Sequence, residues 1–83
     1  MSKWYTIQGH ADITNIEELL LEEQEDGNIY ERYITTTDDS WKPRGNRLFS
    51  LGYNKERLER YCKTNSKVIL TEITEEDAFA IML

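Results

Sequence analysis

The chain has 83 residues, of which 39% are apolar and 31% are charged, and its 16 acidic and 10 basic side chains give a net charge of −6. A chain of this length suits one thin core, so we expect a single domain over 1–83. No apolar run approaches a membrane span, the N-terminus lacks a signal-peptide pattern, and a lone cysteine closes no internal disulfide. These features indicate a cytoplasmic protein, in the host cytoplasm if a phage encodes it.

The charges are segregated along the chain in three blocks. Residues 1–39 carry ten acidic and two basic side chains, and residues 40–67 carry eight basic and two acidic ones. Residues 68–83 add four acidic side chains and no basic one. Segregation of this kind bears on the choice of partner and not on the fold.

The first half of the chain predicts a strand, a helix and a second strand. Apolar and polar residues alternate over 4–13, as they do in a half-buried strand. Thr14 and Glu17 have the spacing of a capping box, so we expect a helix over 15–25. Residues 29–37 are rich in β-branched and aromatic side chains and favour a strand.

A rival prediction for the same segment is a β-hairpin. Residues 18–24 can pair with 29–35 across Glu25-Asp26-Gly27-Asn28, in which Asp-Gly is a strong turn signal. Leucine and glutamate favour a helix over a strand, so the helix is our first prediction.

The next segments predict a loop, a strand and a second helix. Residues 38–46 contain the only proline and a glycine and indicate a loop, and residues 47–53 then favour a strand. Asn54 is a good N-cap for a helix that ends near residues 64–65. The apolar stripe of that helix consists of Leu58, Tyr61 and Cys62.

The last segments predict a strand and a C-terminal helix. Residues 67–73 contain a continuous apolar run that suits a strand covered on both faces, and Thr74 is the expected N-cap of the helix. The apolar residues of this helix are Ala78, Phe79, Ile81, Met82 and Leu83. Because so short a helix is unstable alone in water, we expect it to dock on the chain's own sheet, and we expect a monomer or a homodimer formed through a sheet edge.

The predicted order of elements is β-α-β-β-α-β with an added C-terminal helix. This is the order of the ferredoxin-like plait, an α+β fold with both crossover helices on one face of the sheet. If residues 18–35 form a hairpin instead, the fold is a hairpin-rich α+β fold.

Catalysis is not expected. His10 and Cys62 are the only conceivable base and nucleophile, and the chain offers no recognisable motif with a third, orienting group. Motifs that bind nucleotides, phosphates or calcium are missing from the sequence. We therefore predict a protein that is not an enzyme and has no cofactor and no metal site.

Two candidate binding surfaces remain. The acidic candidate consists of Glu18, Glu22, Glu23, Glu25, Asp26, Asp38 and Asp39. It predicts a small regulator or inhibitor, of the kind that phages and mobile elements encode, which docks on a basic protein. The basic candidate consists of Trp41, Lys42, Arg44 and Arg47. An exposed aromatic ring among cations predicts stacking on bases and pairing with phosphates, and we rank this nucleic-acid function second.

Overall fold

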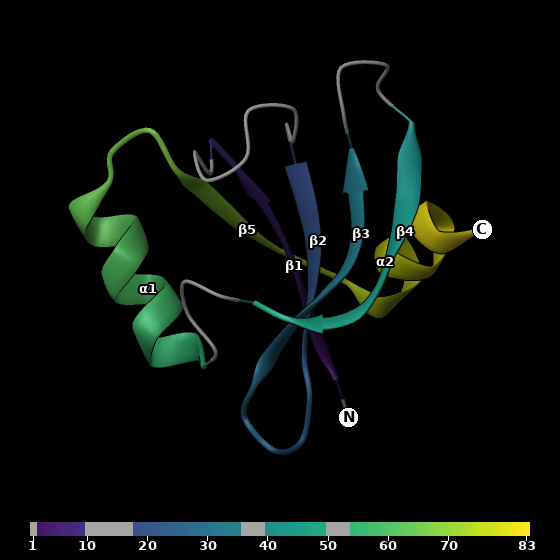
Figure 1. Ribbon diagram of the computed structural model, residues 1–83, viewed down its shortest axis with the longest axis horizontal. Coiled ribbons are helices and arrows are strands. Elements are labelled where there is room, and N and C mark those ends of the chain that lie inside the picture. Colours follow the sequence, from purple (N-terminus) through teal and green to yellow (C-terminus); the bar gives the residue numbers. More distant parts are fainter. Residues whose placement is uncertain (1, 10–17, 36–39, 50–53) are drawn as a thin grey trace.

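The computed structural model describes residues 2–9, 18–35, 40–49 and 54–83, and it contains one curved sheet and two helices (Figure 1). The elements are β1 (Lys3–Gln8), β2 (Glu18–Glu23), β3 (Ile29–Thr35), β4 (Trp41–Leu48), α1 (Lys55–Thr64), β5 (Ile69–Ile73) and α2 (Glu75–Met82). The strand order is β4-β3-β2-β1-β5, and every neighbouring pair is antiparallel. The predicted α+β class is confirmed, and the prediction of a ferredoxin-like plait is wrong.

The error lies in the segment for which a helix over 15–25 is predicted, because its described part is the strand β2. Leu19, Leu20 and Leu21 are all fully buried, since β2 is the middle strand of the sheet and is covered on both faces. Burial on both faces suits a continuous apolar run and outweighs the helical propensity of leucine. The rival prediction of a hairpin is therefore confirmed.

The turn of this hairpin is built from backbone and side-chain hydrogen bonds. The Gln24 N–H donates to the Asn28 carbonyl at 3.0 Å, and the Gly27 N–H donates to the Gln24 carbonyl at 2.9 Å. Gly27 has a φ of +83°, which glycine adopts at little cost. Asp26 accepts a hydrogen bond from the Asn28 N–H at 2.9 Å. The Asp-Gly signal thus marks the turn correctly.

Strand β4 replaces most of the loop predicted over 38–46. Pro43 lies opposite Tyr33 and Arg47 lies opposite Glu31, so the residues between Pro43 and Arg47 form a bulge. Gly45, with a φ of +80°, lies in this bulge. Proline and glycine are compatible with a bulged edge strand, which explains why the prediction of a loop is wrong. The strand expected over 47–53 ends at Leu48, and residues 50–53 lie outside the described residues.

Both described helices begin at the predicted caps. The Asn54 side chain accepts from the Arg57 N–H at 2.9 Å, and the Thr74 hydroxyl accepts from the Asp77 N–H at 3.1 Å. Strand β5 is shorter than the predicted 67–73, and it is an edge strand on which Ile69 is 57% exposed. The expectation that this strand is covered on both faces is therefore wrong.

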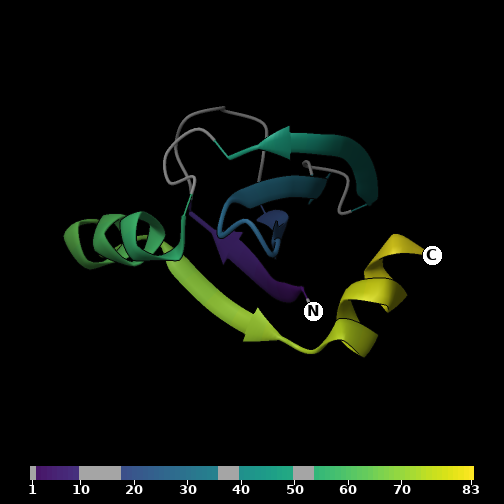
Figure 2. The same cartoon turned by 90° about the horizontal axis from the view of Figure 1, so that it is seen from below.

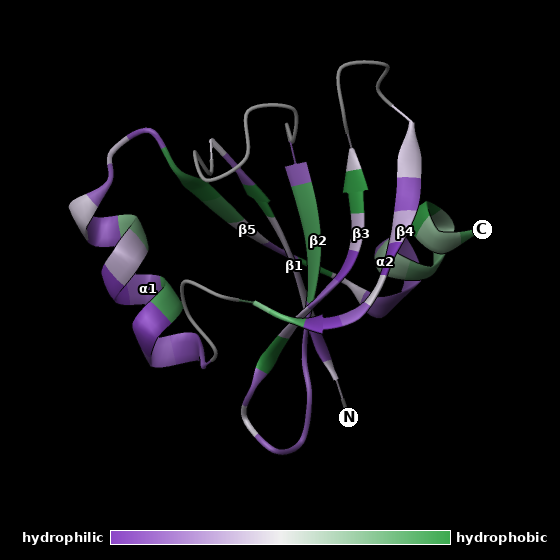
Figure 3. Cartoon of the chain, in the orientation of Figure 1, coloured by the Kyte–Doolittle hydropathy of each residue, from purple (hydrophilic) through white to green (hydrophobic). Residues whose placement is uncertain are grey.

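The core consists of two clusters on opposite faces of the sheet, and Figure 2 shows the two helices at opposite ends of it. The face that packs against α1, called the α1 face, buries Tyr5, Ile7, Leu19, Leu21, Ile29, Phe49 and Leu58. The face that packs against α2, called the α2 face, buries Trp4, Leu20 and Ala78. Figure 3 shows apolar residues concentrated on β2, and polar residues along α1 and at the hairpin turn.

Helix α2 docks on the chain's own sheet, as expected, but through fewer residues than the sequence indicates. Ala78 is buried, and Ile81 and Met82 pack against the α2-face cluster. Phe79 is 49% exposed and Leu83 is fully exposed. The apolar stripe of α2 is thus only partly used in docking.

Candidate functional site

The acidic residues predicted as one surface have different roles in the structure. Glu22 is buried on the α2 face, where its carboxylate pairs with Arg32 and accepts from the Ser2 hydroxyl. Glu23 lies on the other face and accepts from the Tyr5 hydroxyl at 2.9 Å. These two carboxylates stabilise the fold and do not lie side by side.

The remaining predicted acids lie in three places. Glu25 and Asp26 are exposed at the hairpin turn, and Glu18 lies at the opposite end of β2. Asp26 also accepts from the Tyr30 hydroxyl at 3.0 Å, which holds the turn. Asp38 and Asp39 lie outside the described residues. Within the described part of the predicted set, Glu25 and Asp26 at the hairpin turn are thus the exposed carboxylates.

The register of the sheet brings a second acidic block to the same end as this turn. Trp4 of β1 lies opposite Glu22 on one side and opposite Ile73 on the other. Strand β2 ends one residue after Glu22, and β5 ends at Ile73, so the hairpin turn and the start of α2 leave the sheet at the same end. We call the exposed carboxylates of these segments the acidic end: Glu25, Asp26, Glu72, Glu75, Glu76 and Asp77.

Four of these six carboxylates were missed as site residues from sequence alone. The available signal was the last block of the chain, which contains acids and no base after residue 67. What the sequence does not show is that β5 pairs with β1 on the side opposite β2, which brings that block next to the hairpin end of the sheet. In Figure 1 the hairpin turn and the N-terminus extend from the lower edge of the sheet.

The basic candidate is a strand whose cations and ring are partly engaged within the fold. Trp41 is half-buried and packs against the α2-face cluster. The Arg44 Nε atom donates to Glu31 Oε1 at 2.9 Å, and the two side chains are only 20% and 7% exposed. Lys42 and Arg47 are exposed. Glu31 was not identified from sequence as the partner that holds Arg44.

A chain of polar contacts joins α1 to the sheet. The Lys55 ammonium lies 4.4 Å from the centre of the Tyr5 ring, donates to the Tyr5 hydroxyl at 3.3 Å and lies 3.6 Å from Glu59. Burial, followed by the hydrogen bond and charge of Glu23, raises the pKa of Tyr5 above its ordinary value. The hydroxyl therefore stays protonated and acts as a donor within the fold.

The residues considered for catalysis are not brought together by the described structure. His10 lies outside the described residues, and Cys62 is half-buried against the α1-face cluster. Burial raises the pKa of the Cys62 thiol, Glu59 raises it further, and Lys55 lowers it. Within the described ranges, no three His, Cys, Asp or Glu side chains are grouped so as to hold a metal ion.

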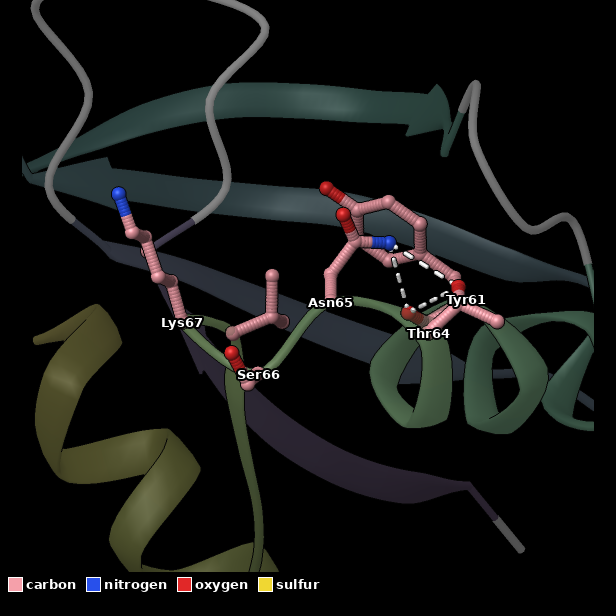
Figure 4. Close-up of a pocket in the computed structure, with 7 residues that line it drawn as sticks. Tyr61, Thr64, Asn65, Ser66 and Lys67 are labelled. Carbon is pink, nitrogen blue, oxygen red and sulfur yellow. Dashed lines mark hydrogen bonds between the residues drawn. The ribbon is translucent and has the colours of Figure 1, made fainter.

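A polar cavity of about 270 Å³ lies where α1 ends and the chain turns into β5 (Figure 4). In its wall the Asn65 amide donates to the Tyr61 carbonyl at 2.9 Å, and the Thr64 hydroxyl donates to the same carbonyl at 3.0 Å. These bonds satisfy carbonyls that the end of a helix leaves without partners. The polar atoms of the cavity thus terminate α1, and they do not converge on one point.

No helix among the described residues is long and apolar enough to cross a bilayer. No family model, no curated protein and no solved structure matches this chain. Function is therefore inferred from the chain's own residues, and among the described ones the acidic end gathers six exposed carboxylates.

Proposed function

We propose that this protein is a protein-binding module, a small regulator or inhibitor, that docks its acidic end on a basic surface of a partner. One observation supports the proposal. The sheet register joins carboxylates of the hairpin turn to those of β5 and α2, although β3, β4 and α1 separate them in the sequence.

Electrostatics gives this arrangement its effect. Like charges gathered at one end of a small domain produce a field that steers an oppositely charged partner and repels nucleic acid. Lys3 and Arg32 lie on the strands of this end, but Arg32 is paired with Glu22 and contributes little to the outer field. Docking through such a surface weakens as salt screens it.

The test uses two variants that change the net charge equally. Glu25→Lys/Glu76→Lys reverses one carboxylate from each acidic segment, and Glu56→Lys/Glu59→Lys reverses two exposed carboxylates on α1. The ion pairs that Glu56 and Glu59 form with Arg60 and Lys55 are i, i+4 pairs on the helix surface, worth about 0.3 to 0.5 kcal/mol each. Neither pair includes Glu22, Glu23 or Asp26, which hold the fold.

In affinity capture from cells that produce the protein, wild type and the α1 variant should retain a basic partner. The acidic-end variant should lose it by on the order of tenfold at low salt and by less at high salt. Each single reversal should give part of the loss, because both segments contact the partner. Equal retention on all baits would contradict the proposal.

The nucleic-acid function of Trp41, Lys42, Arg44 and Arg47 stays a second prediction from sequence. The geometry favours it less, since Trp41 packs against the α2 face and Arg44 is bound to Glu31. A base that stacked on Trp41 would have to compete with this packing.

A further inference from the structure

The two edges of the sheet differ in how well they are protected against pairing with another strand. An exposed strand edge is a template for a further strand, and proteins block such edges with proline, bulges and lysine. The β4 edge contains Pro43, a bulge at Gly45 and the exposed cations Lys42 and Arg47. The β5 edge contains no proline, bulge or cation within Ile69–Ile73, and its single charged side chain is Glu72.

Strand β5 is the outermost strand on its side of the sheet in Figure 2. Ile69 is 57% exposed, and Thr71 and Glu72 are exposed as well. A β-branched apolar side chain with this much exposure on an unprotected edge is a feature of strands that pair with another chain.

The sequence around β5 is complementary to itself about Thr71. In an antiparallel pair of two copies centred on Thr71, Ile69 of each copy lies opposite Ile73 of the other, and Leu70 lies opposite Glu72. The two Ile69–Ile73 contacts place β-branched apolar side chains directly opposite each other on both sides of the two-fold axis. Residues on one face meet residues on the same face, because Ile69 and Ile73 both lie on the α2 face.

Neighbouring registers are less favourable. Centring the pair on Glu72 places that carboxylate opposite its own copy, and like charges directly opposite are destabilising. Centring it on Leu70 places Ile69 opposite Thr71, which removes both Ile69–Ile73 contacts. We propose that β5 pairs with β5 of a second copy in an antiparallel, two-fold arrangement centred on Thr71, which extends the sheet across both copies.

The dimer should be weak and should strengthen with salt. One pair of five-residue strands is a small interface, in the class below roughly 1,200 Å² that characterises weak associations. Each copy has a net charge of −6, so salt screens the repulsion between copies. This salt dependence is opposite to that of docking through the acidic end, so failure of one proposal is distinguishable from failure of the other.

Sedimentation across micromolar to millimolar concentrations tests the interface. Wild type should shift from monomer to dimer, Ile69→Lys should stay monomeric, and Leu48→Lys should behave as wild type. Leu48 is the matched control because it is an exposed apolar residue on the protected β4 edge. A monomeric wild type at every concentration, or a dimer that Ile69→Lys leaves intact, would overturn the proposal.

Two further variants test the register. Thr71→Cys should form a disulfide-linked dimer on oxidation, because directly opposite residues bring their Cβ atoms close enough. Wild type, which keeps Cys62, and Glu56→Cys on α1 should not.

Glu72→Cys should cross-link less than Thr71→Cys, because in this register Glu72 lies opposite Leu70 and not opposite its own copy. A dimer in which Thr71→Cys fails to cross-link, or in which Glu72→Cys cross-links as well as Thr71→Cys, would show that the register is wrong.

Discussion

The α1 face and the α2 face of the sheet are stabilised in different ways. The α1 face buries seven apolar side chains almost completely, from four strands or their ends and from α1. The α2 face buries three and places the Glu22–Arg32 ion pair beside them, with Arg32 5.7 Å from the centre of the Trp4 ring. Within the described structure the buried Trp4 indole N–H has no hydrogen-bond partner, a cost of roughly 1 to 3 kcal/mol. The comparison indicates that the α1 face supplies most of the stability.

A substitution in the core of the α1 face should therefore reduce the free energy of unfolding the most. Leu58 is the fully buried residue by which α1 docks, and Leu58→Ala removes its contacts and leaves a cavity. We expect a loss of about 2 to 5 kcal/mol in the free energy of unfolding, measured by urea denaturation. Lys63→Ala, at an exposed position of the same helix, should change it by less than about 0.5 kcal/mol. A loss below about 1 kcal/mol for Leu58→Ala would show that α1 is not an essential part of the core.

Much of this fold follows from local sequence signals, and the main wrong prediction, a helix in place of β2, has a long-range cause. The caps Asn54 and Thr74 were located correctly because a cap depends only on its own and the next few residues. Strand β2 was predicted as a helix because its state depends on cover from both faces, which is a property of the whole sheet. Local propensity does not contain that information.

The composition of the candidate site also depends on long-range contacts that local sequence signals do not contain. The sequence shows that the hairpin turn is acidic. That the start of α2 lies at the same end of the sheet follows only from the pairing of β1 with β5. Likewise, the sequence alone indicates that Arg44 could bind a phosphate. In the structure Arg44 lies in the bulge of β4 and pairs with Glu31. Long-range strand pairing therefore decides which charges remain exposed.

A substitution on the α2 face should reduce the free energy of unfolding by less. Phe79 contacts the Trp4 ring edge-on with ring centres 6.0 Å apart, but about half of its side chain is exposed. Phe79→Ala should reduce the free energy of unfolding by about 1 to 2 kcal/mol, since only part of its surface is removed from water and one aromatic pair is lost. Leu83→Ala, at a fully exposed position, should have almost no effect. A loss as large as that of Leu58→Ala would contradict the ranking of the two faces.

The smallest loss of stability at neutral pH is expected from the polar contacts of Tyr5 on the α1 face. Tyr5→Phe removes the donor to Glu23 and should reduce the free energy of unfolding by about 1 kcal/mol. Because burial and Glu23 raise the pKa of Tyr5 in the folded state, the hydroxyl keeps its proton after the unfolded chain, with a pKa of about 10, has lost it. The folded state then binds more protons than the unfolded state, so the contribution of Tyr5 is complete below about pH 10 and is lost as the pH rises further.

Urea midpoints of wild type and Tyr5→Phe, measured at a series of alkaline pH values, test this directly. The advantage of wild type should shrink above about pH 10 and then reverse, whereas groups shared by both proteins cancel in the difference. Leu83→Ala, which removes no titratable side chain, is the control, and its difference from wild type should not change with pH. A difference between wild type and Tyr5→Phe that stays constant through this range would show that the Tyr5 hydroxyl is not held protonated by its burial and by Glu23.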